Sequence, residues 1–194
     1  MDTLATAPPD SEPSFFTAKF YLLPHLKMVV CGTGVLNVIT DWFIRINTRL
    51  LVRDLCHLDE FAVSELQEIG RQYNLSDDLT ATIYHFGWAE LEQRFTGFAY
   101  RSKENFRSER LEESVGIKPF FDQTDWLDSQ DINFTEIAKR QRLIDRRKPP
   151  SQRVGIGGEI YMLHMRREQT SVLQLHRFED YNEEYMAMAR RLPG

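Results

Sequence analysis

Residues that form disulfides or bind metals are scarce in this 194-residue sequence. Its two cysteines, Cys31 and Cys56, are too few for a disulfide framework and too far apart for a zinc site. The five histidines show no metal-ligand spacing either. We therefore interpret both cysteines as small apolar residues and expect the protein to hold no metal and no cofactor.

Long apolar runs and an excess of positive charge are also missing. No apolar stretch approaches the ~18 residues that a membrane-spanning helix needs, and the N-terminus lacks the basic and apolar regions of a signal peptide. A net charge of -5 argues against a dedicated nucleic-acid-binding protein. Basic residues that cluster at 139–148 are interpreted as a solvated helix face. We expect a cytoplasmic protein that binds neither membranes nor nucleic acid.

What the sequence does contain is an alternation of strand-like and helix-like segments. Runs of aromatic and branched residues predict strands at 15–23, 27–31, 79–88, 95–100, 155–167 and 170–178. Apolar residues at three-to-four spacing predict helices over 35–55, 60–73, 133–147 and 180–191. Residues 7–14 and most of 101–130 are interpreted as loops. Paired strands separated by helices predict an α+β fold with antiparallel sheets, in one domain over residues 1–194.

Local patterns refine four of these elements. Asp59 is expected near the N-cap of the second helix, and Asn133 followed by Glu136 predicts a capped start of the third. His164 and His176 fall on the two late strands, which are expected to pair, so these side chains could be neighbours.

Three features near the start of the chain occur in a recognisable order. The segment Asp-Thr-Leu-Ala-Thr begins at Asp2, Lys19 follows on an apolar run, and Gly-Thr-Gly ends at Gly34 before the first long helix. This order resembles the proteasome-like branch of the N-terminal nucleophile hydrolases, and the resemblance implies a bacterial proteasome-related protein. The implied fold is a four-layer αββα sandwich, in which two antiparallel sheets are flanked by helices. In that family the nucleophile begins a strand before this aspartate, so we expect an N-terminally incomplete domain without its first strand.

The resemblance also implies roles for individual residues. In this family the terminal α-amino group is the base for the nucleophile, and a nearby ammonium lowers its pKa. Backbone N–H groups form the oxyanion hole. The implied catalytic residues are Asp2, Lys19 and Gly34, and the implied substrate-binding residues are Thr6, Gly32 and Thr33.

A second region of resemblance lies late in the chain. The segment Gly-Gly-Glu-Ile that starts at Gly157 resembles the Gly-Gly turn that begins a late strand of the family. The family places an aspartate and a serine just before this turn, where they support the terminal amine. Here those places fall near Arg153 and Ile156, neither of which can do so.

These features leave three functional interpretations open. The resemblance implies a threonine-type peptidase or amidohydrolase, inactive as the chain stands, that acts on peptide or other amide bonds and assembles as a homo-oligomeric ring or helical stack. A non-catalytic structural or assembly subunit on the same fold is the alternative that Arg153 and Ile156 favour. An α+β module that binds an anion at residues 32–34 is the third, because helix N-termini attract anions.

Overall fold

The computed structural model describes residues 1–7, 12–112 and 132–191, with four α-helices among them. The chain divides into two compact units, and each is described here by itself. Residues 1–18 and 116–194 form unit 1, and residues 19–115 form unit 2. The expectation of one domain over residues 1–194 stays a prediction.

Unit 2 is built on a five-stranded antiparallel sheet with the order β3-β4-β5-β6-β7. The strands are β3 (Phe20–Leu23), β4 (Met28–Gly34), β5 (Ala81–Ala89), β6 (Arg94–Arg101) and β7 (Ser108–Leu111). Short 3-10 turns, η1 (Pro24–Leu26) and η2 (Ser102–Glu104), connect β3 to β4 and β6 to β7. Each strand pairs with the next along the chain, so every connection within the sheet is local except the one that carries the helices.

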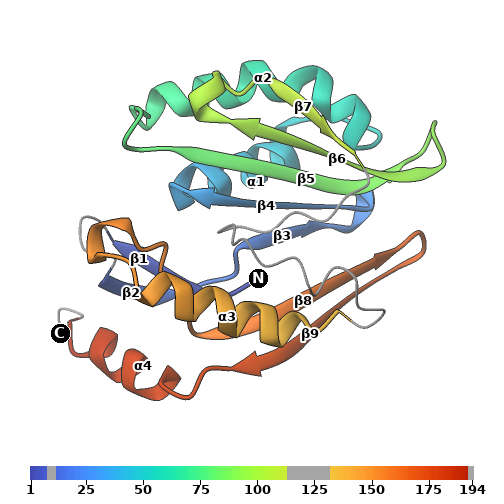
Figure 1. Ribbon diagram of the computed structural model, residues 1–194. Coiled ribbons are helices and arrows are strands. Elements are labelled where there is room, and N and C mark those ends of the chain that lie inside the picture. Colours follow the sequence, from blue (N-terminus) through green and yellow to red (C-terminus); the bar gives the residue numbers. More distant parts are fainter. Residues whose placement is uncertain (8–11, 113–131, 192–194) are drawn as a thin grey trace. The chain divides into compact units, whose positions relative to one another are not determined.

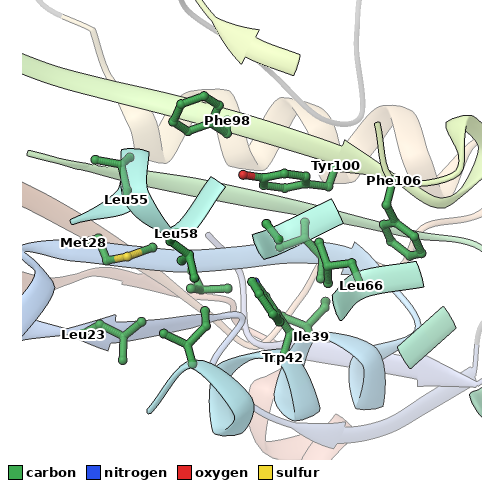
Figure 2. Close-up of a cluster of buried hydrophobic side chains, with 14 of the residues drawn as sticks. Leu23, Met28, Ile39, Trp42, Leu55, Leu58, Leu66, Phe98, Tyr100 and Phe106 are labelled. Carbon is green, nitrogen blue, oxygen red and sulfur yellow. The ribbon is translucent and has the colours of Figure 1, made fainter. Parts of the chain in front are cut away.

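Two helices, α1 (Leu36–Arg49) and α2 (Leu55–Gln72), pack against this sheet (Figure 1). Alternate residues of a strand point to the same face, and β4, β5 and β6 turn branched and aromatic side chains toward the helices. Figure 2 shows Met28, Phe98 and Tyr100 from the sheet meeting Trp42 and Leu58 from the helices. This continuous apolar core holds the helices on the sheet.

The boundary between α1 and α2 differs from the predicted one. The prediction of a single helix over residues 35–55 was wrong, because α1 ends at Arg49 and a new helix begins at Leu55. The N-cap of α2 is Asp54 rather than Asp59, and its carboxylate accepts the N–H of His57 at 2.9 Å. The apolar spacing continues through the break because both helices face the same core.

Two further predictions in this part of the chain need correction. The expected strand at 15–23 is two strands: β2 ends at Phe16 and β3 begins at Phe20, and they belong to different sheets. The expected loop over 101–130 contains β7, which adds an edge strand beside β6. The rest of that expected loop, from residue 113 on, lies outside the described residues.

Unit 1 combines two strand pairs with two helices. Its strands are β1 (Leu4–Ala7), β2 (Glu12–Phe16), β8 (Glu159–Arg166) and β9 (Gln169–Arg177), and its helices are α3 (Phe134–Arg146) and α4 (Tyr181–Ala189). A 3-10 turn, η3 (Pro150–Gln152), follows α3. Asp2 forms an antiparallel bridge with Ile160 and thereby links the start of β1 to β8. The small core consists of Ala138, Ile156, Ile160 and Phe178.

Several predictions for unit 1 are confirmed. Asn133 caps α3, because its side-chain oxygen accepts the N–H of Glu136 at 3.1 Å. The late hairpin forms, but His164 pairs with Ser171 and His176 with Ile160, so the two histidines are not cross-strand neighbours. Antiparallel sheets and four α-helices in the described residues confirm the α+β class.

Candidate functional site

Asp2 anchors the start of β1 to the late glycine turn of unit 1. Its carboxylate Oδ1 accepts the backbone N–H of Leu4 at 3.2 Å and that of Gly157 at 3.4 Å. Next to it, the Thr3 hydroxyl oxygen accepts the N–H of Glu159 at 2.9 Å. The two consecutive side chains therefore bind both ends of the segment 157–159, and Asp2 is held in a fixed position beside it.

The glycines of this turn are required by close packing. Gly158 has a φ of 73°, and a Cβ there would overlap the Thr3 hydroxyl and lie 2.8 Å from the ring of Phe16. A Cβ at Gly157 would lie 2.8 Å from a methyl group of Leu4. Only glycine lets the chain turn this tightly against β1. The expected Gly-Gly turn is therefore present, and it lies directly at Asp2.

Thr6 contacts the loop that leads into this turn. Its hydroxyl donates to the carbonyl of Val154 at 3.4 Å, and its methyl group lies where a Cβ of Gly155 would be. Gly155 has a φ of 75° and gives its N–H to Asp145, whose other oxygen accepts the N–H of Val154. These contacts give Thr6 a structural role, and its predicted role in binding substrate stays a prediction.

A buried arginine connects the two helices of unit 1. The guanidinium of Arg142, whose side chain is 8% exposed, donates to Asp180 at 2.7 Å and to Glu184 at 3.0 Å. It also lies 4.1 Å from the ring centroid of Phe178. Burial raises the pKa of Glu184, and the backbone N–H of Gly158 opposes that rise. The charged cluster thus extends from α3 through α4 to the glycine turn.

Sequence reasoning missed this cluster. The basic residues at 139–148 were interpreted as a solvated face, which is wrong for Arg142. The only signal in the sequence was spacing, because Arg142 lies four residues after Ala138 and three before Asp145; the structure shows that all three are buried. Residues at this spacing share one face of a helix.

Arg153 and Ile156 have structural roles. The guanidinium of Arg153 donates to the carbonyls of Lys148 at 2.9 Å and Arg146 at 3.0 Å, and so binds the C-terminal end of α3. Ile156 is buried against Ala138 in the small core. Neither side chain offers a proton acceptor beside the glycine turn.

The other predicted site residues lie in unit 2. Lys19 lies at a bend between β2 and β3, so the prediction that a strand presents it was wrong. The Gly-Thr-Gly segment is not a turn, because Gly32, Thr33 and Gly34 continue β4 and pair with β5. Helix α1 begins at Leu36, just after this segment, and anion binding there stays a prediction.

Packing explains both glycines of this segment. A Cβ at Gly32 would lie 2.6 Å from the carbonyl oxygen of Thr82 and 2.8 Å from the side chain of Ile39. Gly34 has a φ of 93°, and a Cβ there would overlap the carbonyl of Thr80, which accepts the N–H of Val35 at 3.0 Å. The glycines allow β4 to approach β5 and α1 closely.

The residues of the predicted site are divided between the two units. Asp2 and Thr6 meet the late glycine turn in unit 1, whereas Lys19, Gly32, Thr33 and Gly34 belong to unit 2. The catalytic and substrate-binding roles of all six stay predictions. Among the residues that the structure describes, no group of three or more His, Cys, Asp or Glu side chains could hold a metal ion. Within the same residues, no helix is long and apolar enough to cross a membrane.

Comparison with known proteins gives similarity in structure alone. No protein-family model matches the chain, and no curated protein matches it in sequence. Anbu (ancestral beta-subunit) from Yersinia bercovieri has a similar structure, with a TM-score of 0.50 and 18% identity over 100% of this chain and 92% of that one. The Anbu (Gly-1) mutant from Hyphomicrobium sp. strain MC1 gives a TM-score of 0.51 at 18% identity, over 97% of this chain and 88% of that one.

These findings correct the family resemblance drawn from the sequence. Identification as a proteasome-like N-terminal nucleophile hydrolase was wrong as stated, because the similar structures are Anbu proteins, which are not identical to the classic members of that family. An identity of 18% shows a shared fold and no specific activity. At the level of the fold, the chain is similar to Anbu (ancestral beta-subunit) proteins.

Proposed function

We propose that this chain is a non-catalytic structural subunit on a proteasome-like β-subunit fold, and that it assembles with further copies of itself. The observation that supports this most strongly is the pair of roles that Arg153 and Ile156 have beside the glycine turn. Arg153 binds the end of α3, and Ile156 fills the small core. The cytoplasmic location expected from the sequence is part of the same proposal.

The chemistry of these two residues supports a structural role. An amidase that uses a terminal amine as its base needs groups nearby that orient this amine and accept its protons. A guanidinium keeps its proton throughout the physiological pH range, and here two backbone carbonyls already accept from it. Ile156 has no polar atom. A terminal amine near this turn would therefore receive no support from either position.

The contacts of Asp2 point in the same direction. Its Oδ1 accepts two backbone N–H groups, from Leu4 and Gly157, which is the role of a side chain that fixes a turn. Thr3 and Thr6 make comparable contacts to the same loop. The residues at the start of the chain thus stabilise unit 1, and this function requires no reaction.

The test combines an activity assay with a measurement of mass. Purified wild-type protein and Lys19→Ala are incubated with fluorogenic peptides, and the molar mass of both is measured by light scattering. We expect the same background hydrolysis from both proteins and a mass of several chains for both. Hydrolysis by the wild type that Lys19→Ala abolishes would support the peptidase interpretation instead. A wild-type protein that stays monomeric at every concentration would contradict assembly.

A further inference from the structure

β9 presents an open edge in unit 1. It pairs with β8 from Gln169 to Arg177, with a bulge at Leu175, and β8 is bridged on its other side by Asp2. Within residues 1–7, 12–112 and 132–191, no strand pairs with the second edge of β9. A nine-residue edge strand exposes a row of backbone N–H and C=O groups that can pair with another chain.

Before the bulge at Leu175, residues 169–174 of β9 lack the usual protection of an edge strand. Residues 169–176 contain no Asp, Glu, Lys or Arg and no proline. Natural edge strands are commonly kept from pairing by short length, by charged side chains or by proline. Both edges of the unit 2 sheet follow that rule: β3 and β7 have four residues each, and β7 carries the exposed charges of Glu109 and Arg110. β9 is longer than both, and unlike β7 it has no charged residue over 169–176.

Apolar side chains are exposed on both faces of this edge. Val172 is 41% exposed and Leu173 is 50% exposed. Successive residues of a strand point to opposite faces, so the two side chains lie on opposite sides of the hairpin. They pair with Leu163 and Met162 of β8, which extend the two apolar faces. An added strand would cover apolar surface on both sides at once.

We propose that β9 pairs antiparallel with β9 of a second copy of this chain. A two-fold antiparallel pairing places the strand opposite itself, so any charge near the axis would face a like charge. Residues 169–176 have no such charge. With the axis at Leu173, Arg177 of one copy lies opposite Gln169 of the other. In this register Thr170 lies opposite His176, and these two side chains can form a cross-strand hydrogen bond.

This pairing would close at two copies, because the same surface is used on both sides. It joins two β8–β9 hairpins into one four-stranded sheet across the interface. The inference rests on the proposed function, since it names one surface through which the structural subunit assembles. It concerns only β9 and leaves other interfaces of a larger assembly unspecified.

The experiment places a charge at the centre of the proposed pairing. Leu173→Lys would bring two ammonium groups close to the axis, whereas Leu91→Lys, at an 80% exposed leucine between β5 and β6, is the matched control. Sedimentation over a concentration series gives the mass, and backbone hydrogen exchange reports protection of residues 169–176. Circular dichroism shows that each variant is folded, and Val172→Lys replaces Leu173→Lys if that variant does not fold.

The expected result has three parts. Leu173→Lys halves the mass or weakens the pairing at least tenfold, while Leu91→Lys behaves as the wild type. Protection of residues 169–176 in the wild type falls on dilution and is missing in Leu173→Lys. Wild-type oligomers whose mass and protection survive Leu173→Lys would overturn the β9 pairing alone. A monomeric wild type would overturn the proposed function as well, and protection that appears only with an added extended peptide would show a different occupant.

Discussion

The indole N–H of Trp42 donates to Nε2 of His85 at 2.7 Å in the centre of unit 2. The two rings are nearly parallel, with centroids 5.8 Å apart, and both side chains are fully buried (Figure 2 labels Trp42). Since an indole can only donate, Nε2 of His85 must be unprotonated to accept. The core of this unit therefore contains a neutral imidazole, and burial lowers the pKa of His85 to about 3.

Acid is expected to destabilise the protein through this histidine. The pKa of His85 is about 3 in the folded state and 6.5 as its ordinary value, so the unfolded chain binds a proton first. The contribution of neutral His85 to the free energy of unfolding is therefore fully present above pH 6.5. It falls as the pH drops toward 3, by up to about 1.4 kcal/mol per pH unit. Urea unfolding followed by circular dichroism at pH 7, 6 and 5 measures the slope.

A matched pair of variants assigns this slope to His85. His85→Leu should be less stable at pH 7, because it leaves the buried Trp42 N–H without its acceptor, but its stability should change less between pH 7 and 5. His25→Gln, at an exposed histidine, should keep the wild-type slope. An unchanged slope in His85→Leu would show that another group titrates.

Asp54 is expected to stabilise unit 2 through two hydrogen bonds. Its Oδ1 caps α2 at His57, and its Oδ2 accepts the N–H of Glu90 at 3.0 Å, in the connection between β5 and β6. Asp54→Ala should lower the free energy of unfolding by about 2 kcal/mol or more, because it removes a helix cap and leaves a buried N–H unpaired. Asp78→Ala, at an exposed loop position, is the control and should change stability by less than about 0.5 kcal/mol. Chemical denaturation measures both.

Gly34→Ala is expected to destabilise the junction of β4 and α1. The new Cβ would overlap the Thr80 carbonyl, and the backbone would have to keep a φ of 93° that alanine disfavours. A strained backbone of this kind costs about 1–3 kcal/mol, to which the steric overlap adds. Thermal unfolding compared with Asn37→Ala, at an exposed position of α1, checks the prediction. A stable Gly34→Ala protein would mean that packing does not explain this glycine.

Arg142→Ala is expected to destabilise unit 1 by less than the roughly 3–5 kcal/mol that a fully unpaired buried charge costs, because Arg146 still contacts Asp180 and Glu184. Glu184, which is 14% exposed, would lose its 3.0 Å contact with Arg142 and keep only the 3.8 Å contact with Arg146. Its pKa is already raised by burial, so its protonated form is favoured at low pH and the penalty grows as the pH rises. The loss relative to wild type should therefore be smaller at pH 4.5 than at pH 7. Arg140→Ala, an exposed arginine on the same helix, should have little effect at either pH.

Local patterns were sufficient for several elements. The α3 cap, from Asn133 to Glu136, and the β8–β9 hairpin were predicted close to their observed positions. A cap needs residues only three positions apart, and a hairpin needs a turn between two alternating runs. Boundaries within a continuous apolar pattern were predicted less well, as the break between α1 and α2 shows.

The fold class was confirmed, whereas the roles of the candidate site residues stay predictions. A short motif order pointed to Asp2, Lys19 and Gly34, but the structure shows a structural role for the first, a bend at the second and a strand at the third. Backbone packing explains Gly34 without any oxyanion. Family membership could not follow from such motifs, because each residue type has a common structural use.

The amino-acid sequence by itself determined the periodic segments and hence the α+β class, because the spacing of apolar residues records which face of each element is buried. Tertiary structure decided which distant side chains meet. Arg142 and Glu184 are 42 residues apart, and Trp42 and His85 are 43 apart. Such pairs depend on how whole elements pack, and no spacing within a single element encodes them.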